Sequence, residues 1–147
     1  MGLTTVQLYD SLGYAKLDPY CLYAAFAPVD DNMAFIKVGI SSFPLRRIYA
    51  VHCGSPVGIE QALWAHVGSS GQARKIERFI HKRLNPYRSR GEWFEMDMTS
   101  KEQKTLFHWT CKIAYGRITG RALTWRKISI NEIRAVLGIE GFTVGSK

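Results

Sequence analysis

Two apolar runs separated by a short polar turn constrain the fold more than any other feature of the chain. The first run, residues 20–29, is rich in aromatic and small apolar side chains, and it ends at Pro28 and the Asp30-Asp31-Asn32 cluster. The second run, residues 34–40, follows almost at once. Short apolar runs on either side of a turn signal are typical of a β-hairpin. The sequence therefore predicts a pair of buried antiparallel strands at the start of the sheet.

The rest of the chain alternates between helical and strand-like patterns bounded by Gly, Pro, Ser and Asn. In chain order these patterns predict a helix over 41–52, a strand over 57–67, a helix over 72–84, a strand over 92–96 and helices over 99–115 and 129–137. Such an order is typical of an α/β fold. We expect a small mixed sheet that starts with the antiparallel hairpin, is flanked by helices and carries a C-terminal helical extension.

Length and composition favour one globular domain. The chain has 147 residues, of which 46% are hydrophobic and 22% charged, so it can bury a core without disulfide support. We expect a lead-in segment over residues 1–19, a central domain over 20–98, and a helical extension over 99–147 that packs on the same domain.

The sequence also bears on the compartment. No apolar run approaches the roughly 20 residues that a membrane span requires, and the first residues lack the pattern of a secretory signal. The three cysteines Cys21, Cys53 and Cys111 form no C-x-x-C pair, which favours buried free thiols over disulfides or zinc ligands. A cytoplasmic protein without a membrane partner is expected.

Charge indicates the class of partner. The chain carries a net charge of +8 and a pI near 9.6, so it attracts polyanions. Seven basic residues and one acid, Glu77, give a local net charge of +6 between positions 74 and 90. A solvated helix face usually carries interspersed acids that pair with its basic residues, and this segment has only one. A surface that faces phosphates is therefore favoured over a merely solvated one. The basic residues are Arg74, Lys75, Arg78, Lys82, Arg83, Arg88 and Arg90.

A series of short motifs, in order along residues 20–96, resembles the GIY-YIG nuclease superfamily. The motifs are Cys21-Leu22-Tyr23, Lys37-Val38-Gly39, Pro44 with Arg47, Glu77 in a helix, and Gly91-Glu92-Trp93-Phe94. They are most similar to the phage and mobile-element branch, in which Lys-Ile-Gly replaces Tyr-Ile-Gly and a histidine follows the helix glutamate by four residues. On this resemblance the central domain, 20–98, is a GIY-YIG-like nuclease domain.

The resemblance implies a phosphodiesterase site with one metal ion laid across a small sheet. Tyr23 matches the tyrosine beside the attacking water, and Arg47 matches the arginine that stabilises the phosphate, with Arg46 as the near alternative. Glu77 matches the metal ligand. Phosphodiester hydrolysis needs a divalent cation, and one carboxylate with several retained waters suits Mg²⁺ (or Mn²⁺).

Helical spacing gives independent support to Glu77. At about 100° per residue it lies at the margin of the apolar stripe over residues 73–84, and His81 lies on the same margin one turn later. An acid at this margin can lean over the edge of the sheet. A simple ion pair of Glu77 with Arg74 or Arg78 is the alternative.

Three departures from the family pattern bear on catalysis. Lys37 replaces the second tyrosine, and because a lysine ordinarily has a pKa of about 10.4, we expect a phosphate clamp here and not a base. His52, five residues after Arg47, is the candidate for the catalytic helix histidine, with a half-buried or surface histidine as the alternative. Asn85 matches the late asparagine only by its position.

The residues expected to contact nucleic acid lie on the two basic helices and the turn after the second. They are Arg46, Arg74, Lys75, Arg78, His81, Lys82, Tyr87, Arg88 and Arg90. Tyr87 is expected to be exposed and able to stack on bases. Trp93 and Phe94 fit either base stacking or the core side of an edge strand, and core packing is favoured.

Two functions fit these observations. The first is a metal-dependent endonuclease that hydrolyses phosphodiester bonds in DNA, with DNA favoured over RNA. The alternative is a non-catalytic nucleic-acid-binding module, a regulator or counter-defence protein on the same scaffold, because Lys37 and the missing asparagine weaken the case for catalysis. One small domain leaves little room to read a long site, which favours recognition of structure, a protein partner or a homodimer.

Overall fold

A computed structural model describes residues 20–55 and 57–139 of the chain. The strands are β1 (Tyr20–Pro28), β2 (Met33–Ser41), β3 (Gln61–Gly68), β4 (Trp93–Asp97) and β5 (Arg126–Ser129). The helices are α2 (Pro44–Gly54), α3 (Ser70–Arg83), α4 (Lys101–Thr119) and α5 (Ile130–Leu137), with a 3₁₀ turn, η1 (Asn85–Tyr87), after α3. The expected lead-in over 1–19 and the end of the extension over 140–147 lie outside the described residues.

The predicted hairpin is confirmed. β1 and β2 pair antiparallel, with Cys21 opposite Ser41 at one end and Pro28 opposite Ala34 at the other. Asp30 holds the turn, because its Oδ1 accepts hydrogen bonds from two backbone N–H groups, of Asn32 and Met33, at 2.8 Å each. The polar cluster seen in the sequence is therefore a turn stabilised by its own aspartate.

The α/β class is confirmed, and the sheet has the strand order β4-β2-β1-β3-β5. A mixed sheet was the expectation, but each neighbouring pair of described strands is antiparallel. β2 and β3 do run in the same direction, as expected for strands joined through a helix. They are not neighbours, because β1 lies between them and is antiparallel to both.

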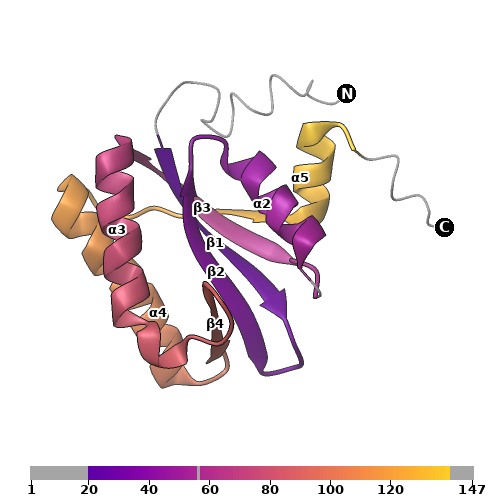
Figure 1. Cartoon of the computed structure of the whole chain (residues 1–147), viewed down its shortest axis with the longest axis horizontal. Coiled ribbons are helices and arrows are strands. Elements are labelled where there is room, and N and C mark those ends of the chain that lie inside the picture. The colour runs from indigo at the N-terminus through magenta and orange to yellow at the C-terminus, as the bar shows by residue number, and fades with distance from the viewer. Residues whose placement is uncertain (1–19, 56, 140–147) are drawn as a thin grey trace.

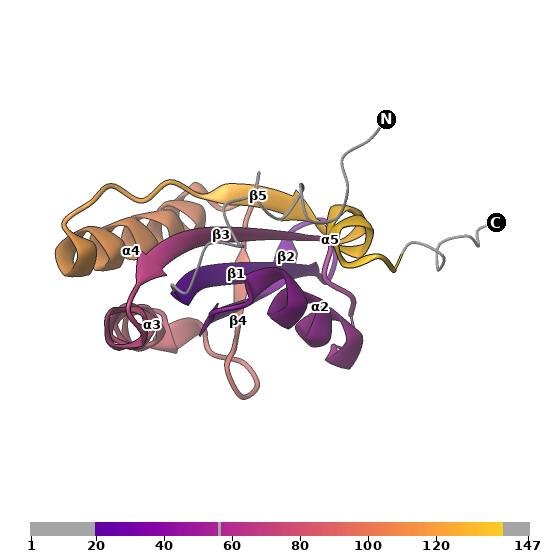
Figure 2. The same ribbon diagram turned by 90° about the horizontal axis from the view of Figure 1, so that it is seen from above.

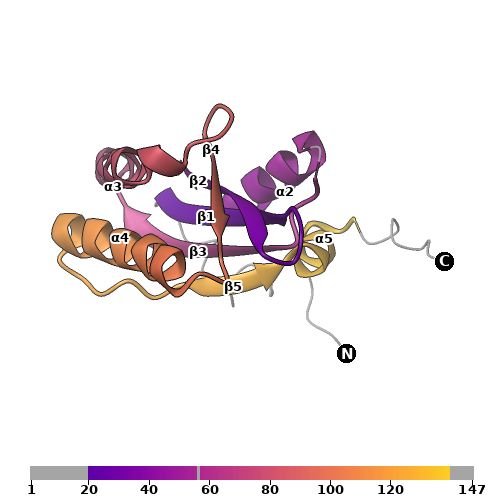
Figure 3. The same ribbon diagram turned by 90° about the horizontal axis from the view of Figure 1, so that it is seen from below.

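Helices cover both faces of the sheet. Side chains alternate along β1, so Leu22 and Ala24 face one core while Tyr23 and Ala25 face the other. Figures 1 and 2 show α3 and α4 on the first face and α2 and α5 on the second. The turn before β4 projects between α3 and α2 (Figure 3). None of the described helices is long and apolar enough to cross a membrane.

The C-terminal part shares these layers. α4 packs on α3, and α5 packs on α2. The expected helix over 129–137 is confirmed, with Gly138 in the left-handed conformation at its end. β5 was not expected, because its four residues include Arg126 and Lys127 and lack a clear alternating pattern. It pairs with β3 and extends the same sheet.

The cysteines differ from one another in burial. Cys21 and Cys111 are buried free thiols, as expected, and burial raises the pKa of Cys21 to about 12 and that of Cys111 as well. Cys53 is also free but exposed, which corrects the expectation that all three are buried. It lies in the last turn of α2, outside the buried stripe of that helix.

Ser69 fixes the start of α3 through a capping box, and this generates a test. Its Oγ accepts from Gln72 N–H at 3.1 Å, while Gln72 Oε1 accepts from Ser69 N–H at 3.3 Å. Ser69→Ala is expected to lower the free energy of unfolding by about 1 kcal/mol, measured by urea unfolding. Ser70→Ala, one residue later in the same turn, is the matched control and should change it by less than about 0.5 kcal/mol. Equal losses from both variants would contradict the assigned cap.

Candidate functional site

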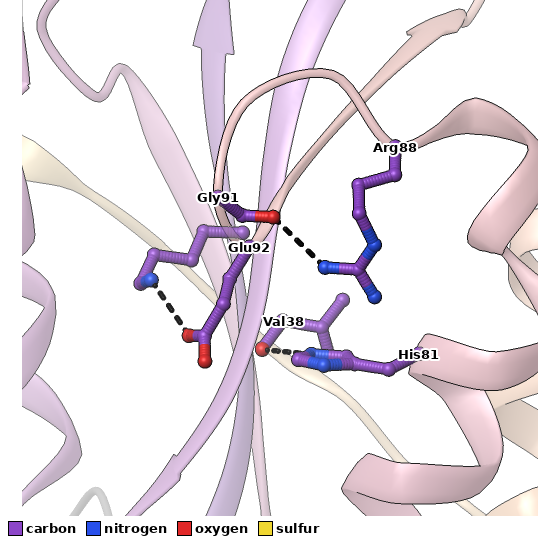
Figure 4. A network of polar contacts seen from close by, with 6 residues as sticks. Val38, His81, Arg88, Gly91 and Glu92 are labelled. Carbon is purple, nitrogen blue, oxygen red and sulfur yellow. Dashed lines mark hydrogen bonds and ion pairs between the residues drawn. The ribbon is translucent and has the colours of Figure 1, made fainter.

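The candidate site lies at the edge of β2 where this strand extends beyond β4. β4 pairs only with residues 33–37, so in the described structure residues 38–41 have β1 on one side and no strand on the other. His81 of α3 occupies part of this edge: its Nε2 lies 2.8 Å from the carbonyl oxygen of Val38 (Figure 4). Because a carbonyl oxygen only accepts, Nε2 carries the proton. The open edge lets side chains from both faces of the sheet meet.

Tyr23 lies at this edge because Gly39 has no side chain. The two residues are cross-strand partners, and a Cβ added to Gly39 would lie 2.5 Å from Tyr23 Oη. The phenol ring thus lies over β2 at Gly39, and any larger residue at position 39 would displace the ring. Tyr23 is 1% exposed. Burial raises the pKa of Tyr23, so the phenol is protonated at neutral pH.

Arg47 is the cation next to Tyr23. It lies in the first turn of α2, and its guanidinium acts on the phenol and opposes the effect of burial on the Tyr23 pKa. Arg46, the alternative considered for the same role, lies with its guanidinium carbon 6.0 Å from the ring centroid of Phe43. Of the two arginines, the structure therefore brings Arg47 to the site.

Glu77 approaches the same edge from α3. It is half-buried, and burial raises the pKa of Glu77. The His81 imidazole opposes this rise, the Glu92 carboxylate adds to it, and the charge of Lys37 lowers it. Glu77 also raises the pKa of Tyr23. No ion pair of Glu77 with Arg74 or Arg78 is found in the described structure, so the simple surface pair considered as the alternative is absent.

Lys37 and Glu92 form an ion pair beside these groups. Lys37 Nζ donates to Glu92 Oε1 at 3.1 Å, and this hydrogen bond lowers the pKa of Glu92. The Lys37 side chain is 15% exposed, whereas that of Glu92 is 59% exposed. The ion pair holds the Lys37 ammonium beside the candidate site, and its role as a phosphate clamp stays a prediction. Glu92 received no role from the sequence, because only the β2–β4 register, with Lys37 opposite Trp93, shows that the two meet.

Arg88 fastens the turn that carries Glu92. Its Nε donates to Asn85 Oδ1 at 3.0 Å and its Nη1 to the Gly91 carbonyl at 2.8 Å (Figure 4). Its guanidinium carbon also lies 5.2 Å from the ring centroid of Phe94. Arg88 was expected to contact nucleic acid and Asn85 was the candidate for the late asparagine. Both hold the turn in place and both are exposed, so their expected functional roles stay predictions.

His52 is engaged away from the cluster of Tyr23, Arg47 and Glu77. Its Nδ1 accepts from the backbone N–H of Ile59 at 2.9 Å, and its Nε2 faces Arg134 at 3.5 Å. Burial and the charge of Arg134 lower the pKa of His52. These contacts join the end of α2 to the segment before β3 and to α5. They support the half-buried histidine over the catalytic one.

The remaining expected contacts divide by position. Four basic residues of α3 are exposed and can face a polyanion: Arg74, Lys75, Arg78 and Lys82. Arg83 instead turns toward α4, with its guanidinium carbon 5.4 Å from the Trp109 ring centroid. Tyr87 is partly buried against the core, contrary to the expected exposure. Phe94 is fully buried, whereas Trp93 is only half-buried and lines a pocket with Arg90.

The donor set fits a hard divalent cation that keeps most of its waters. In residues 20–55 and 57–139 no group of three or more His, Cys, Asp or Glu side chains is arranged to hold a metal. Glu77 and Glu92 supply two carboxylates close enough for Glu92 to raise the pKa of Glu77. A cation near both would relieve their repulsion. Oxygen ligands in this small number suit Mg²⁺ or Mn²⁺, which take further oxygens from water and phosphate.

A family model described as the T5orf172 domain matches residues 20–111, more than half of the chain. The match runs from the first residue of β1 into α4 and includes the whole cluster described above. Comparison with the curated proteins and with the solved structures finds no match.

The raised pKa of Glu77 predicts a stability that depends on pH. The folded state binds protons at Glu77 more tightly than the unfolded chain, so wild type loses stability as the pH rises through the interval between the two pKa values. The variant Glu77→Gln has no carboxyl group to ionise here, so it does not lose stability in this way. Its melting temperature should exceed that of wild type at pH 7 in EDTA, and the difference should shrink below the ordinary glutamate pKa of about 4.3.

Scanning calorimetry measures both melting temperatures, with Glu60→Gln, an exposed glutamate, as the control. Mn²⁺ should raise the melting temperature of wild type more than that of Glu77→Gln, because ligands stabilise the state that binds them. A gain for Glu77→Gln that does not vary with pH would contradict the assignment of a partly desolvated carboxylate.

Proposed function

The chain belongs to the T5orf172 domain family, and from this membership and the cluster around Tyr23 we propose that it is a metal-dependent endonuclease that hydrolyses phosphodiester bonds in DNA. Membership in this endonuclease-related family indicates a nuclease-like or nucleic-acid-binding function. One observation supports the step to hydrolysis: the Tyr23 phenol lies against Gly39 at the open edge of β2, and the charges of Arg47 from α2 and Glu77 from α3 both act on it.

In the proposed site Glu77 would hold Mg²⁺ or Mn²⁺, with Glu92 as the second carboxylate. When bound, such a cation polarises the phosphate and stabilises the charge that develops on it. The protein supplies the other groups. The Arg47 guanidinium has the planar donors that grip phosphate oxygens, and Lys37 adds a second positive charge.

Tyr23 would position the attacking water. Its phenol is protonated at neutral pH and can both donate and accept a hydrogen bond, so it orients water without acting as a base. The Arg47 guanidinium, which lowers the Tyr23 pKa against the effect of burial, would help to orient the phenol oxygen. Gly39 keeps the ring in this place because it leaves the space that the ring fills.

The exposed basic face of α3, defined by Arg74, Lys75, Arg78 and Lys82, would bind the phosphate backbone. Glu77 projects from the same helix, so a duplex held by this face lies against the candidate site. The charge of Arg74 lowers the Glu77 pKa, which supports a basic face next to the candidate site. The preference for DNA rests on the resemblance to GIY-YIG nucleases.

A second function is favoured by one observation, the Lys37–Glu92 ion pair. Lys37 replaces a motif tyrosine, and its ion pair engages the second carboxylate of the site. A protein with this pair could bind nucleic acid without cutting it. This alternative is a non-catalytic binding module that uses the same basic face.

Cleavage of labelled DNA with Mg²⁺ or Mn²⁺ distinguishes the two functions. Duplex, single-stranded and branched DNA are incubated with wild type, Arg47→Ala and Arg46→Ala. We expect Arg47→Ala to reduce the rate by a factor of about 100 or more, as for loss of a group that stabilises transition-state charge. Arg46→Ala removes the same charge one residue away and should retain most activity. Glu77→Gln should abolish cleavage.

Equal cleavage by wild type and Glu77→Gln would show that a contaminant cuts the DNA and would remove the hydrolase proposal. Tight binding by wild type without cleavage under any of these conditions would favour the non-catalytic module.

The basic face of α3 generates a separate prediction about binding. Arg78→Gln/Lys82→Gln should weaken DNA binding and reduce the slope of log K against log salt by about 0.9 for each phosphate that the variant no longer neutralises. Fluorescence anisotropy at several salt concentrations measures this slope. Lys101→Gln/Lys112→Gln removes the same charge from exposed positions on α4 and should leave the slope nearly unchanged. A slope that responds equally to both pairs would show that net charge, and not this face, governs binding.

A further inference from the structure

A pocket of about 630 Å³ opens beside Lys37, on the face of the sheet that α2 covers. Phe35 of β2 and Trp93 of β4 form one side, and the segment after α2, with Ser55 and Val57, borders it. The turn before β4 contributes Arg90. The volume lies in the range of roughly 300–1,000 Å³ that small-molecule sites have in proteins.

The walls of this pocket suit a flat aromatic ring. Phe35 and Trp93 meet edge to face, with ring centroids 6.3 Å apart and planes at 72°. Both rings are only half-buried, so each keeps accessible surface. Arg90 is the charged residue among the described side chains that line the pocket, and no acid is among them. Aromatic surface beside a cation favours a stacking partner attached to an anion.

Lys37 connects this pocket to the candidate cleavage site. Its Nζ lies 5.8 Å from the ring centroid of Trp93 and 3.1 Å from Glu92 Oε1. Glu92 in turn affects the pKa of both Glu77 and Tyr23. A phosphate held at Lys37 would therefore lie near both the Glu92 carboxylate and the Trp93 ring.

Trp93 packs against the second core but keeps part of its ring accessible. The neighbouring Phe94 is fully buried and provides the core contact of β4. Trp93 points to the opposite face, where it is partly exposed next to the pocket. An aromatic side chain in this position is available to a ligand.

We propose that the pocket binds one unpaired nucleobase, that of the nucleotide next to the phosphate at Lys37. This inference rests on the proposed function and names its substrate class: nucleic acid with an unpaired or extruded nucleotide at the cleavage site. A base inside a duplex is stacked on both faces and cannot reach Trp93 or Phe35. An unpaired base can enter the pocket at little cost and stack there.

Binding of matched oligonucleotides in EDTA tests the proposal independently of cleavage. One DNA duplex carries a single-nucleotide bulge, and a second carries the same bulge with an abasic site, which keeps the phosphates and removes the base. Fluorescence anisotropy should show wild type binding the base-containing bulge about tenfold more tightly, within the range of one base–aromatic stack. Trp93→Leu should lose this difference. Trp109→Leu, at an aromatic residue of α4 that is 46% exposed, should keep it.

Equal binding of the two bulges by wild type would overturn the inference, and so would a full preference in folded Trp93→Leu. Phe35→Leu removes the other ring and should reduce the preference too, so the test holds even if Trp93→Leu fails to fold. Cleavage of the same duplexes with Mg²⁺ separates this inference from the proposed function. If wild type cleaves both duplexes but binds them equally well, the base-binding pocket is refuted and the proposed function stands. If wild type binds neither duplex, both the pocket and the proposed function are refuted.

Discussion

The pairing of Tyr23 with Gly39 across β1 and β2 is the contact that holds the site together. The register of the hairpin puts a large phenol opposite the one residue type that leaves room for it. The ring then fills the space above β2, where the Arg47 charge acts on its hydroxyl group. A bulkier residue at position 39 would move the phenol, and the arginine would lose its partner. The hairpin is thus both the first unit of the sheet and the floor of the site.

The second constraint is electrostatic. Glu77 is held where burial and the nearby Glu92 both disfavour its charge, and the surrounding cations only partly offset this. The Lys37–Glu92 pair lies at the same edge, with the lysine mostly buried and the glutamate mostly exposed. Charged groups that are partly removed from water are common where a protein binds ions and charged ligands. A bound ligand of opposite charge replaces the stabilisation that water would otherwise give.

Much of this arrangement could be predicted from the sequence, and the limits have physical causes. The hairpin and α3 follow from local patterns, namely turn residues and helical spacing. The grouping of Tyr23, Arg47 and Glu77 comes only from the resemblance to GIY-YIG nucleases. The role of Glu92 follows from neither, because it depends on how β4 aligns with β2. The surroundings of His52 were missed for a related reason, because Arg134 of α5, one of its neighbours, is distant in sequence. The catalytic role of His52 stays a prediction. Contacts between segments that are far apart in the chain are set by packing, which no local pattern encodes.

The position of a bound cation decides whether Glu77, Tyr23 and Arg47 form one metal-dependent site. Crystals soaked with Mn²⁺ would give an anomalous difference map in which the ion appears without reference to any assumed site. We expect a single strong peak at the Glu77 carboxylate, on the side that faces Tyr23 Oη and Arg47. A peak elsewhere, or a Glu77 side chain directed away from the phenol with no ion beside it, would contradict this assignment.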